Sequence, residues 1–216
     1  MTGIPPFNWY DALLHPQEES GKRRLALLQA AFDVVAEVGF EGLRTRAVAQ
    51  RAKVNIATLH YYFPTKQSLV EGLAQFIGAR FVVLHGPAPV PSGYPALDRL
   101  RQEFSDGRYY LEHQPKMLIV MAEFVLRGKR DPEVQKVVEV MNGHWRRGLE
   151  QMVIDGINQG PFRAELDPKQ TIPTLMAVFS GVGAAQPEEL EAIQHSVEDW
   201  LLQDGIAKTM SGANHE

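Results

Sequence analysis

The residues whose types and spacing could do chemistry are concentrated between Thr45 and Leu69. This stretch reads TRAVAQRAKVNIATLHYYFPTKQSL and combines cationic side chains with hydroxyl groups, an amide, an imidazole and two neighbouring phenols. Such groups form hydrogen bonds to phosphates, which position a protein on DNA, and to base edges, which specify a sequence. The stretch therefore suggests recognition of nucleic acid.

Two short helices are predicted to position these groups. Thr45 can cap a helix over residues 46–52, and residues 53–55 then make a turn. Asn55 is one of the strongest N-cap residues and starts a second helix over residues 56–63. Two short helices joined by a tight turn form a helix-turn-helix. The second helix, about 12 Å long, fits the major groove of DNA, which is about 12 Å wide.

The second helix is predicted to divide its side chains between a core and a groove. Leu59 and Phe63 are four residues apart and should anchor the helix inward, as Val48 and Ala49 should anchor the first helix. Lys66 opens the following helix, where its ammonium group could reach a phosphate. The side chains expected to face outward are those of Thr58, His60, Tyr61 and Tyr62.

The charge distribution agrees with a nucleic-acid partner for this part of the chain only. The net charge is −4, yet residues 21–70 carry eight basic and three acidic side chains, whereas residues 71–216 carry 14 basic and 20 acidic ones. A basic segment joined to an acidic body suggests two tasks in one chain. The alternative is that the basic residues form an ordinary solvated face.

The Thr45–Leu69 stretch resembles the tetracycline-repressor (TetR) family of bacterial transcriptional regulators. The resemblance covers about residues 22–72, and two positions depart from the family's pattern. Lys53 occupies a turn position where the family often has glycine, which best tolerates a positive φ, and His60 stands where the family commonly has tyrosine. The resembling residues are Gly39-Phe40, Thr45, Val48-Ala49, Ala52, Val54, Thr58 to Phe63 and Lys66 to Leu69.

The resemblance implies a role in DNA binding for each matching position. Thr45 would cap its helix and touch a phosphate, and Arg46 would form a bidentate pair with a base edge such as that of guanine. Residues 56–58 would face bases, while the two tyrosines and Lys66 would hold the backbone. Alternatively, Arg46 is a solvated surface residue and Tyr62 a packing residue. The predicted DNA-binding set is Thr45, Arg46, Lys53, Asn55, Ile56, Ala57, Thr58, His60, Tyr61, Tyr62 and Lys66.

Helical patterns continue along the whole chain. Apolar residues recur at spacings of three and four from Leu25 to Val35, and Pro132, Pro168 and Pro187 each follow a residue that can begin a helix. No convincing run of alternating β-branched residues predicts a strand. The expected fold is all-α, with an N-terminal three-helix helix-turn-helix head joined to a C-terminal helical bundle.

Three parts of the chain are predicted. Residues 1–20, which include Phe7, Trp9 and Tyr10, form an N-terminal arm. Residues 21–70 form the helix-turn-helix DNA-binding domain, and residues 71–216 form a ligand-binding and dimerisation domain. Within that domain the segment GPAPVPSGYP contains four prolines and is expected to be a loop between helices.

A pocket for a largely apolar small-molecule effector is predicted in the body. The segment from Met117 to Leu126 is nearly all apolar and should be a central helix, but Glu123 interrupts it. Glu123 could pair with Arg127 one helical turn later, or it could anchor a ligand in an otherwise apolar pocket. Apolar residues at helical spacing are more often plain core. The candidate pocket residues are Phe104, Tyr109, Met117, Met121, Glu123, Phe124, Met141 and Trp145.

The last two helices, over about residues 169–185 and 187–208, are candidates for a dimer interface. The first is rich in small residues, and the second carries an apolar face that ends near Trp200. The TetR resemblance implies that these helices form a homodimer; the alternative is an intramolecular hairpin. A dimer would place two recognition helices about 34 Å apart, so that they read a palindromic operator in double-stranded DNA.

Other classes of function lack support in the sequence. The chain has no cysteine, no clustered metal-ligand motif, no cofactor fingerprint and no apolar run long enough to span a membrane, so no metal, no cofactor and a cytoplasmic location are expected. No catalytic motif predicts an enzyme. The leading hypothesis is a repressor that a small molecule releases from DNA. The alternatives are a DNA-binding dimer that senses nothing and an all-α enzyme.

Overall fold

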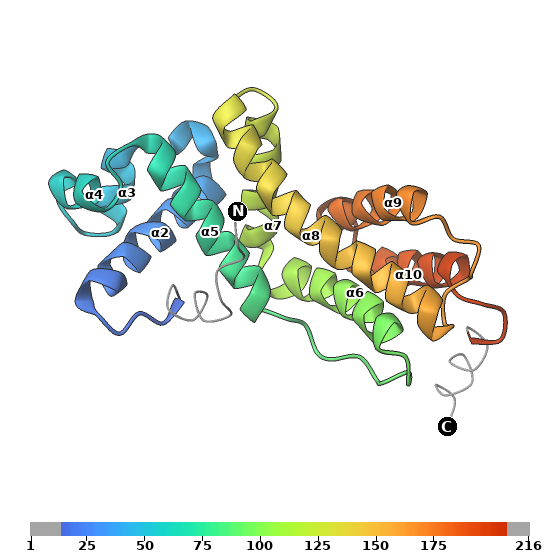
Figure 1. Cartoon of the computed structure of the whole chain (residues 1–216). Coiled ribbons are helices and arrows are strands. Elements are labelled where there is room, and N and C mark those ends of the chain that lie inside the picture. The colour runs from blue at the N-terminus through green and yellow to red at the C-terminus, as the bar shows by residue number, and fades with distance from the viewer. Residues whose placement is uncertain (1–13, 207–216) are drawn as a thin grey trace. The chain divides into compact units, whose positions relative to one another are not determined.

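The computed structural model describes residues 14–206, and the fold of this range is helical. The predicted arm, with Phe7, Trp9 and Tyr10, falls largely outside the described residues. Within that range an isolated antiparallel bridge between Phe162 and Leu202 is the only β-type pairing, so the all-α prediction is confirmed. The helices (Figure 1) are α2 (Glu19–Val38), η1 (Phe40–Gly42), α3 (Thr45–Arg51), α4 (Ile56–Tyr62), α5 (Lys66–Val83), α6 (Pro95–His113), α7 (Pro115–Gly128), α8 (Pro132–Gln159), α9 (Pro168–Gly181), η2 (Val182–Ala184) and α10 (Pro187–Leu201).

The chain divides into two compact units that do not follow the order of the sequence. The first unit contains residues up to Leu84 together with residues 116–141, and the second contains residues 85–115 and everything from Asn142 onward. Helix α8 therefore contributes to both units. Within residues 14–206 no helix is both long enough and apolar enough to cross a membrane.

The core of the first unit is built on α2. Leu28, Phe32 and Val35 lie on one face of this helix and are buried, as their spacing predicts. Gly39 ends the helix with a positive φ of 70°, which glycine adopts without strain. Phe40 follows and packs edge-on against the ring of Phe124, with 4.9 Å between the ring centroids. Helix α7 thus shares a core with the helix-turn-helix region, and the start of α8 contributes Val134 and Val138 to the same core.

The core of the second unit brings together α6, the later half of α8, α9 and α10. Phe104 and Phe162 are fully buried there, beside Leu149 and Leu175. Apolar burial of this extent is the main source of stability in a helical unit. Arg101 and Glu198 join α6 to α10 through a buried ion pair, with both guanidinium contacts at 2.9–3.0 Å.

Two predicted helix ends are wrong. Thr45 is the first residue of α3 and not its cap, because the carbonyl of Arg44 already accepts the first helical hydrogen bond, from the N–H of Val48 at 3.1 Å. The last helix ends at Leu201 rather than near residue 208. Leu202 is extended and pairs with Phe162 in the isolated bridge, which turns the chain out of the helix.

Candidate nucleic-acid interface

Helices α3 and α4 form the predicted helix-turn-helix, and both are anchored to the core of the first unit. Val48 and Ala49 bury the inner face of α3, while Leu59 and Phe63 bury that of α4. The guanidinium of Arg24 lies over the ring of Phe63, 5.3 Å from its centroid, which closes the end of α4 against α2. A seven-residue helix is too short to be stable alone, so this packing is what holds α4 in place.

Asn55 fixes the start of α4. Its side-chain oxygen accepts hydrogen bonds from the backbone N–H of Thr58 at 2.7 Å and from the Thr58 hydroxyl at 2.9 Å. The predicted N-cap is therefore confirmed. Both side chains are engaged with each other before any DNA binds.

The turn between the two helices depends on an unusual backbone conformation at Lys53. Its φ is 55°, which makes it the one non-glycine residue of residues 14–206 with a positive φ. The N–H of Val54 reaches back to the carbonyl of Ala49 at 3.0 Å and closes the turn. The turn thus keeps a backbone conformation that suits glycine, and Lys53 adopts it at the cost of some strain. In place of a glycine, the turn presents the exposed ammonium group of Lys53.

The outer face of α4 is open to solvent. Tyr61 is 78% exposed, Ile56 is 40% exposed, and Ala57 and His60 are exposed as well. Arg46 and Lys66 stand exposed on the neighbouring helices. A surface depression of about 410 Å³ is lined by Arg23, Asn55, Ala57, Thr58, Tyr61 and Tyr62.

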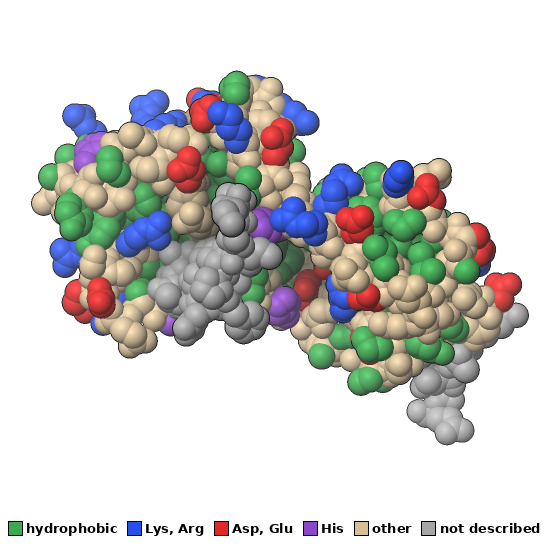
Figure 2. All heavy atoms as spheres, in the orientation of Figure 1, with side chains coloured by type: hydrophobic (Ala, Val, Ile, Leu, Met, Phe, Trp, Pro, Cys, Tyr) green, Lys and Arg blue, Asp and Glu red, His purple; other side chains and the backbone are tan. Residues whose placement is uncertain are grey.

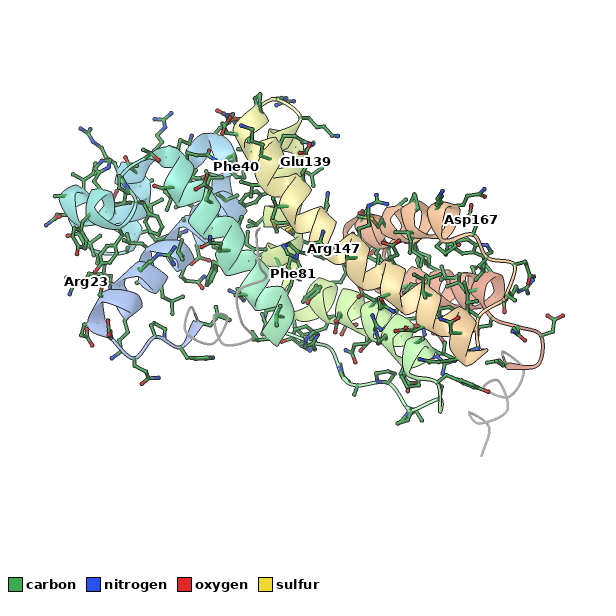
Figure 3. The ribbon with its side chains drawn as sticks, viewed as in Figure 1. Arg23, Phe40, Phe81, Glu139, Arg147 and Asp167 are labelled. Atoms are coloured by element: carbon green, nitrogen blue, oxygen red, sulfur yellow. The ribbon has the colours of Figure 1, made fainter. Side chains whose placement is uncertain are left out.

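Arg23 is a member of this surface that the motif did not identify. It lies on α2, near the beginning of the helix (Figure 3), and its side chain lines the same depression as the residues of α4. The sequence marked Arg23 only as part of a basic segment. Its position beside α4 depends on how α2 packs, which lies outside the motif.

Tyr61 and Tyr62 differ in environment although they are neighbours. Tyr62 is half-buried and packs against the core, and its hydroxyl lies 3.4 Å from that of Ser20. Its ring meets that of Tyr61 edge-on, with 5.0 Å between centroids. Tyr62 therefore has a packing role in the free protein, whereas Tyr61 has few contacts to hold it.

Positive charge around α3 and α4 is largely uncompensated. Arg51 is neutralised by Glu37 at 2.7 Å, and the hydrogen bond from Arg51 holds the pKa of Glu37 below its ordinary value. Lys and Arg side chains surround this end of the first unit in Figure 2. Those without an acidic partner among the described residues are Arg23, Arg44, Arg46, Lys53 and Lys66. An uncompensated cationic surface attracts the phosphate backbone.

The candidate ligand residues are divided between the two cores. Met117 and Phe124 are buried in the first, with Met121 and Met141 packed against it. Phe104 is buried in the second, with Trp145 packed against it, and Tyr109 lies on the same helix as Phe104.

Glu123 has a structural partner that the sequence did not indicate. Its carboxylate accepts a hydrogen bond from the N–H of Phe40 at 2.9 Å, beside Gly39. The expected pair with Arg127 is wrong, because the Arg127 guanidinium contacts Glu41 and Asp131 at 3.0 Å each. Both residues thus connect α7 to the segment that follows α2, Glu123 through Phe40 and Arg127 through Glu41.

The last two helices leave some of their predicted interface open. Ala177, Ser180 and Gly181 on α9 are exposed, and Trp200 on α10 is 37% exposed. The remaining apolar face of α10 is used within the second unit, where Leu190, Val197 and Leu201 are buried. No group of His, Asp and Glu able to hold a metal ion occurs within residues 14–206.

Comparison with known proteins agrees with this geometry. The family model for bacterial regulatory proteins of the tetR family matches residues 27–73. The HTH-type transcriptional repressor KstR of Rhodococcus jostii is 26% identical over 130 residues, which span 59% of this chain and 60% of that protein. The match to curated relatives thus leaves a large part of both chains uncovered.

Solved structures resemble a larger part of the fold. A TetR-family transcriptional regulator from Rhodococcus superposes with a TM-score of 0.73 at 21% identity, covering 84% of this chain and all of that one. A transcriptional regulator from Saccharomonospora viridis, solved in complex with choline, gives 0.69 at 16% identity, with 84% and 98% covered. The helix-turn-helix region thus matches the tetR family of bacterial regulatory proteins over residues 27–73, and the described fold resembles that of TetR-family structures.

Proposed function

We propose that this protein is a sequence-specific DNA-binding transcriptional regulator that contacts DNA through α3, the turn and α4. The observation that carries the proposal is the division of α4, whose Leu59 and Phe63 are buried while Tyr61 and Ala57 are open to solvent. A helix anchored in this way can enter the major groove, and the cations beside it can bind phosphates.

Arg46 is the residue best suited to read a base in this proposal. It is exposed on α3 and has no ionic partner among residues 14–206, so its guanidinium is available for a bidentate pair with guanine. Tyr61, Lys53 and Lys66 would contact the backbone. Asn55 and Thr58 would act mainly by holding the first turn of α4, because they are bonded to each other.

The test is a selection of bound sequences from a random DNA pool, followed by gel-shift titration on the selected site. Arg46→Ala should weaken binding by about 1–3 kcal/mol and relax the preference at one base position. Arg146→Ala removes the same charge from an exposed position in the second unit and is the matched control. An equal loss in both variants would contradict a base contact by Arg46.

We also propose a homodimer formed through α9 and α10, with a palindromic operator as its target. The exposed small residues of α9 and the exposed Trp200 support this assignment. Small residues allow helices to approach closely, and paired recognition helices read two half-sites about 34 Å apart. Sedimentation equilibrium measures the mass in solution, and an asymmetric selected site bound by a monomer would exclude this arrangement.

A small-molecule effector that releases the protein from DNA is part of the same proposal. The relative KstR is a repressor, and a structural neighbour was solved with choline bound. We therefore propose that this chain is a cytoplasmic repressor rather than an enzyme. The competing proposal is a DNA-binding dimer that senses nothing. Thermal-shift screening separates the two, since a ligand that binds the folded state raises Tm.

A further inference from the structure

A carboxylate is hydrogen-bonded to the edge of an aromatic cluster in the second unit. Glu103 on α6 is half-buried and accepts a hydrogen bond from the indole N–H of Trp145 on α8, at 3.3 Å. The Trp145 ring lies 6.2 Å from that of Phe179 on α9, and the Phe179 ring lies 5.0 Å from that of Phe104. Three helices that pack together in this unit (Figure 1) thus contribute rings to one aromatic cluster, and Glu103 is bonded to this cluster through Trp145.

Glu103 lacks a positive partner among the described residues. The two basic side chains that act on its charge are paired elsewhere, since Arg99 binds Asp155 at 3.0 Å and His85 lies 3.0 Å from Asp106. Burial, reinforced by the charge of Asp106, raises the pKa of Glu103 above its ordinary value, and the Trp145 hydrogen bond and the charges of Arg99 and His85 only partly oppose this. The carboxylate is therefore poorly compensated where it stands.

Glu198, in the same unit, is a buried acid whose negative charge is compensated by Arg101. Burial alone would raise the pKa of this group, but hydrogen bonds from Arg101 and Gln194 outweigh burial and lower the pKa. The second unit can thus supply a counter-charge to a buried acid. Glu103 instead accepts one hydrogen bond, from the Trp145 indole, and the charges of Arg99 and His85 act on it without an ion pair among the described residues.

We infer that Glu103 and Trp145 form a recognition site for a substituted organic ammonium ion. The inference rests on the proposal that the chain binds a small-molecule effector, and it names the chemical class of that effector. A carboxylate supplies the charge, and the face of an indole is the best aromatic partner for a cation. Phe179, half-buried beside Trp145, extends the apolar surface for the substituents of the ion.

The same geometry argues against an inorganic cation. Divalent metal ions require several oxygen ligands, and residues 14–206 contain no cluster of three or more acidic or histidine side chains. One carboxylate with aromatic neighbours suits an ion that carries its charge on carbon-substituted nitrogen. Such an ion is weakly hydrated and loses little on leaving water.

Calorimetric titration of the full chain tests the inference. The probes are tetramethylammonium, tetraethylammonium and benzyltrimethylammonium, each as its chloride, with neopentylbenzene as the neutral counterpart of the last. We expect benzyltrimethylammonium to bind more tightly than its neutral counterpart. Glu103→Gln, which keeps an acceptor for the Trp145 N–H, should weaken the binding of the cation by about tenfold or more.

Glu112→Gln is the matched control, because it removes the same charge from an exposed position on the same helix. It should leave the affinity for the cation unchanged. Trp145→Phe should weaken cation binding and leave the weak binding of neopentylbenzene nearly unchanged. Circular dichroism of each variant confirms that the helices form.

Two results would overturn the inference. One is that none of the three cations binds, and the other is that binding is the same in Glu103→Gln as in the original chain. Gel shifts on the selected operator, made with the same preparations, keep the two proposals apart. If the original chain binds the operator but none of the cations, only the ammonium site is refuted. If the original chain does not bind the operator, the proposed DNA-binding function is refuted.

Discussion

The two units handle charge in opposite ways. The first unit leaves its cations unpaired and exposed around α4, where Arg46, Lys53 and Tyr61 meet solvent. The second unit takes charge out of solvent, fully in the Arg101–Glu198 pair and partly at Glu103, which is bonded to the Trp145 indole. Exposed cations favour a large, strongly charged partner such as DNA, whereas an enclosed acidic group favours a small one.

The largest effect is expected when the buried pair of the second unit is broken. Glu198→Leu leaves the Arg101 guanidinium buried without its carboxylate, which should lower the free energy of unfolding by about 3–5 kcal/mol. Urea denaturation followed by circular dichroism measures this loss. The double variant Glu198→Leu/Arg101→Met should recover most of it, because it removes the orphaned charge.

A failure of the double variant to recover would mean that packing, and not charge, accounts for the loss. No comparable effect is expected in the first unit. Arg51 and Glu37 are both exposed, and exposed ion pairs contribute about 0–1 kcal/mol. Arg51→Gln should therefore leave the denaturation midpoint nearly unchanged.

The next effect concerns the cap of α4 in the first unit. Asn55→Ala removes the acceptor for the Thr58 N–H and should destabilise the protein by about 1 kcal/mol. Affinity for the selected operator should fall as well, since the first turn of α4 frays. Asn55→Asp keeps the acceptor and should keep the stability, although its charge should still weaken binding to DNA. Loss of stability in both variants would exclude the capping explanation.

Lys53 allows the conformation of the turn and its charge to be separated. Lys53→Gly relieves the positive φ of 55° and should raise the free energy of unfolding by about 1 kcal/mol. The same change removes a cation, so affinity for DNA should fall and its salt dependence should become shallower. Lys53→Ala loses the charge and keeps the strain. A glycine variant no more stable than the alanine variant would show that the turn is unstrained.

The first unit was largely predictable because its site is local in the sequence. Asn55, Leu59 and Phe63 lie within nine residues, and helical spacing alone assigns the cap and the buried face. The contacts of the second unit were not predictable, because they join segments that are far apart in the sequence. Glu103 and Trp145 are 42 residues apart, and no periodic pattern pairs them. The partner of Glu123 was missed for the same reason, since it is a backbone N–H 83 residues away.

The smallest expected effect tests the charge of Glu103 directly. Its pKa is raised in the folded chain, so the folded state holds this proton more tightly than the unfolded state does. At neutral pH the ionised group is destabilising, and Glu103→Gln should raise Tm by about 2 °C or less. As the pH falls toward the ordinary value of 4.5, the original chain takes up the proton first in its folded state, and the difference in Tm should shrink.

Differential scanning calorimetry at several pH values measures that difference, with Glu112→Gln as the exposed control. The opposite sign is expected for a group such as Glu198, whose lowered pKa means that its contribution is lost as the pH falls. A Glu103→Gln variant that instead lowered Tm at neutral pH, with the loss disappearing on acidification, would place Glu103 with Glu198, as a compensated structural acid. That result would contradict the distinction between Glu198, which stabilises the fold, and Glu103, which is available to a ligand.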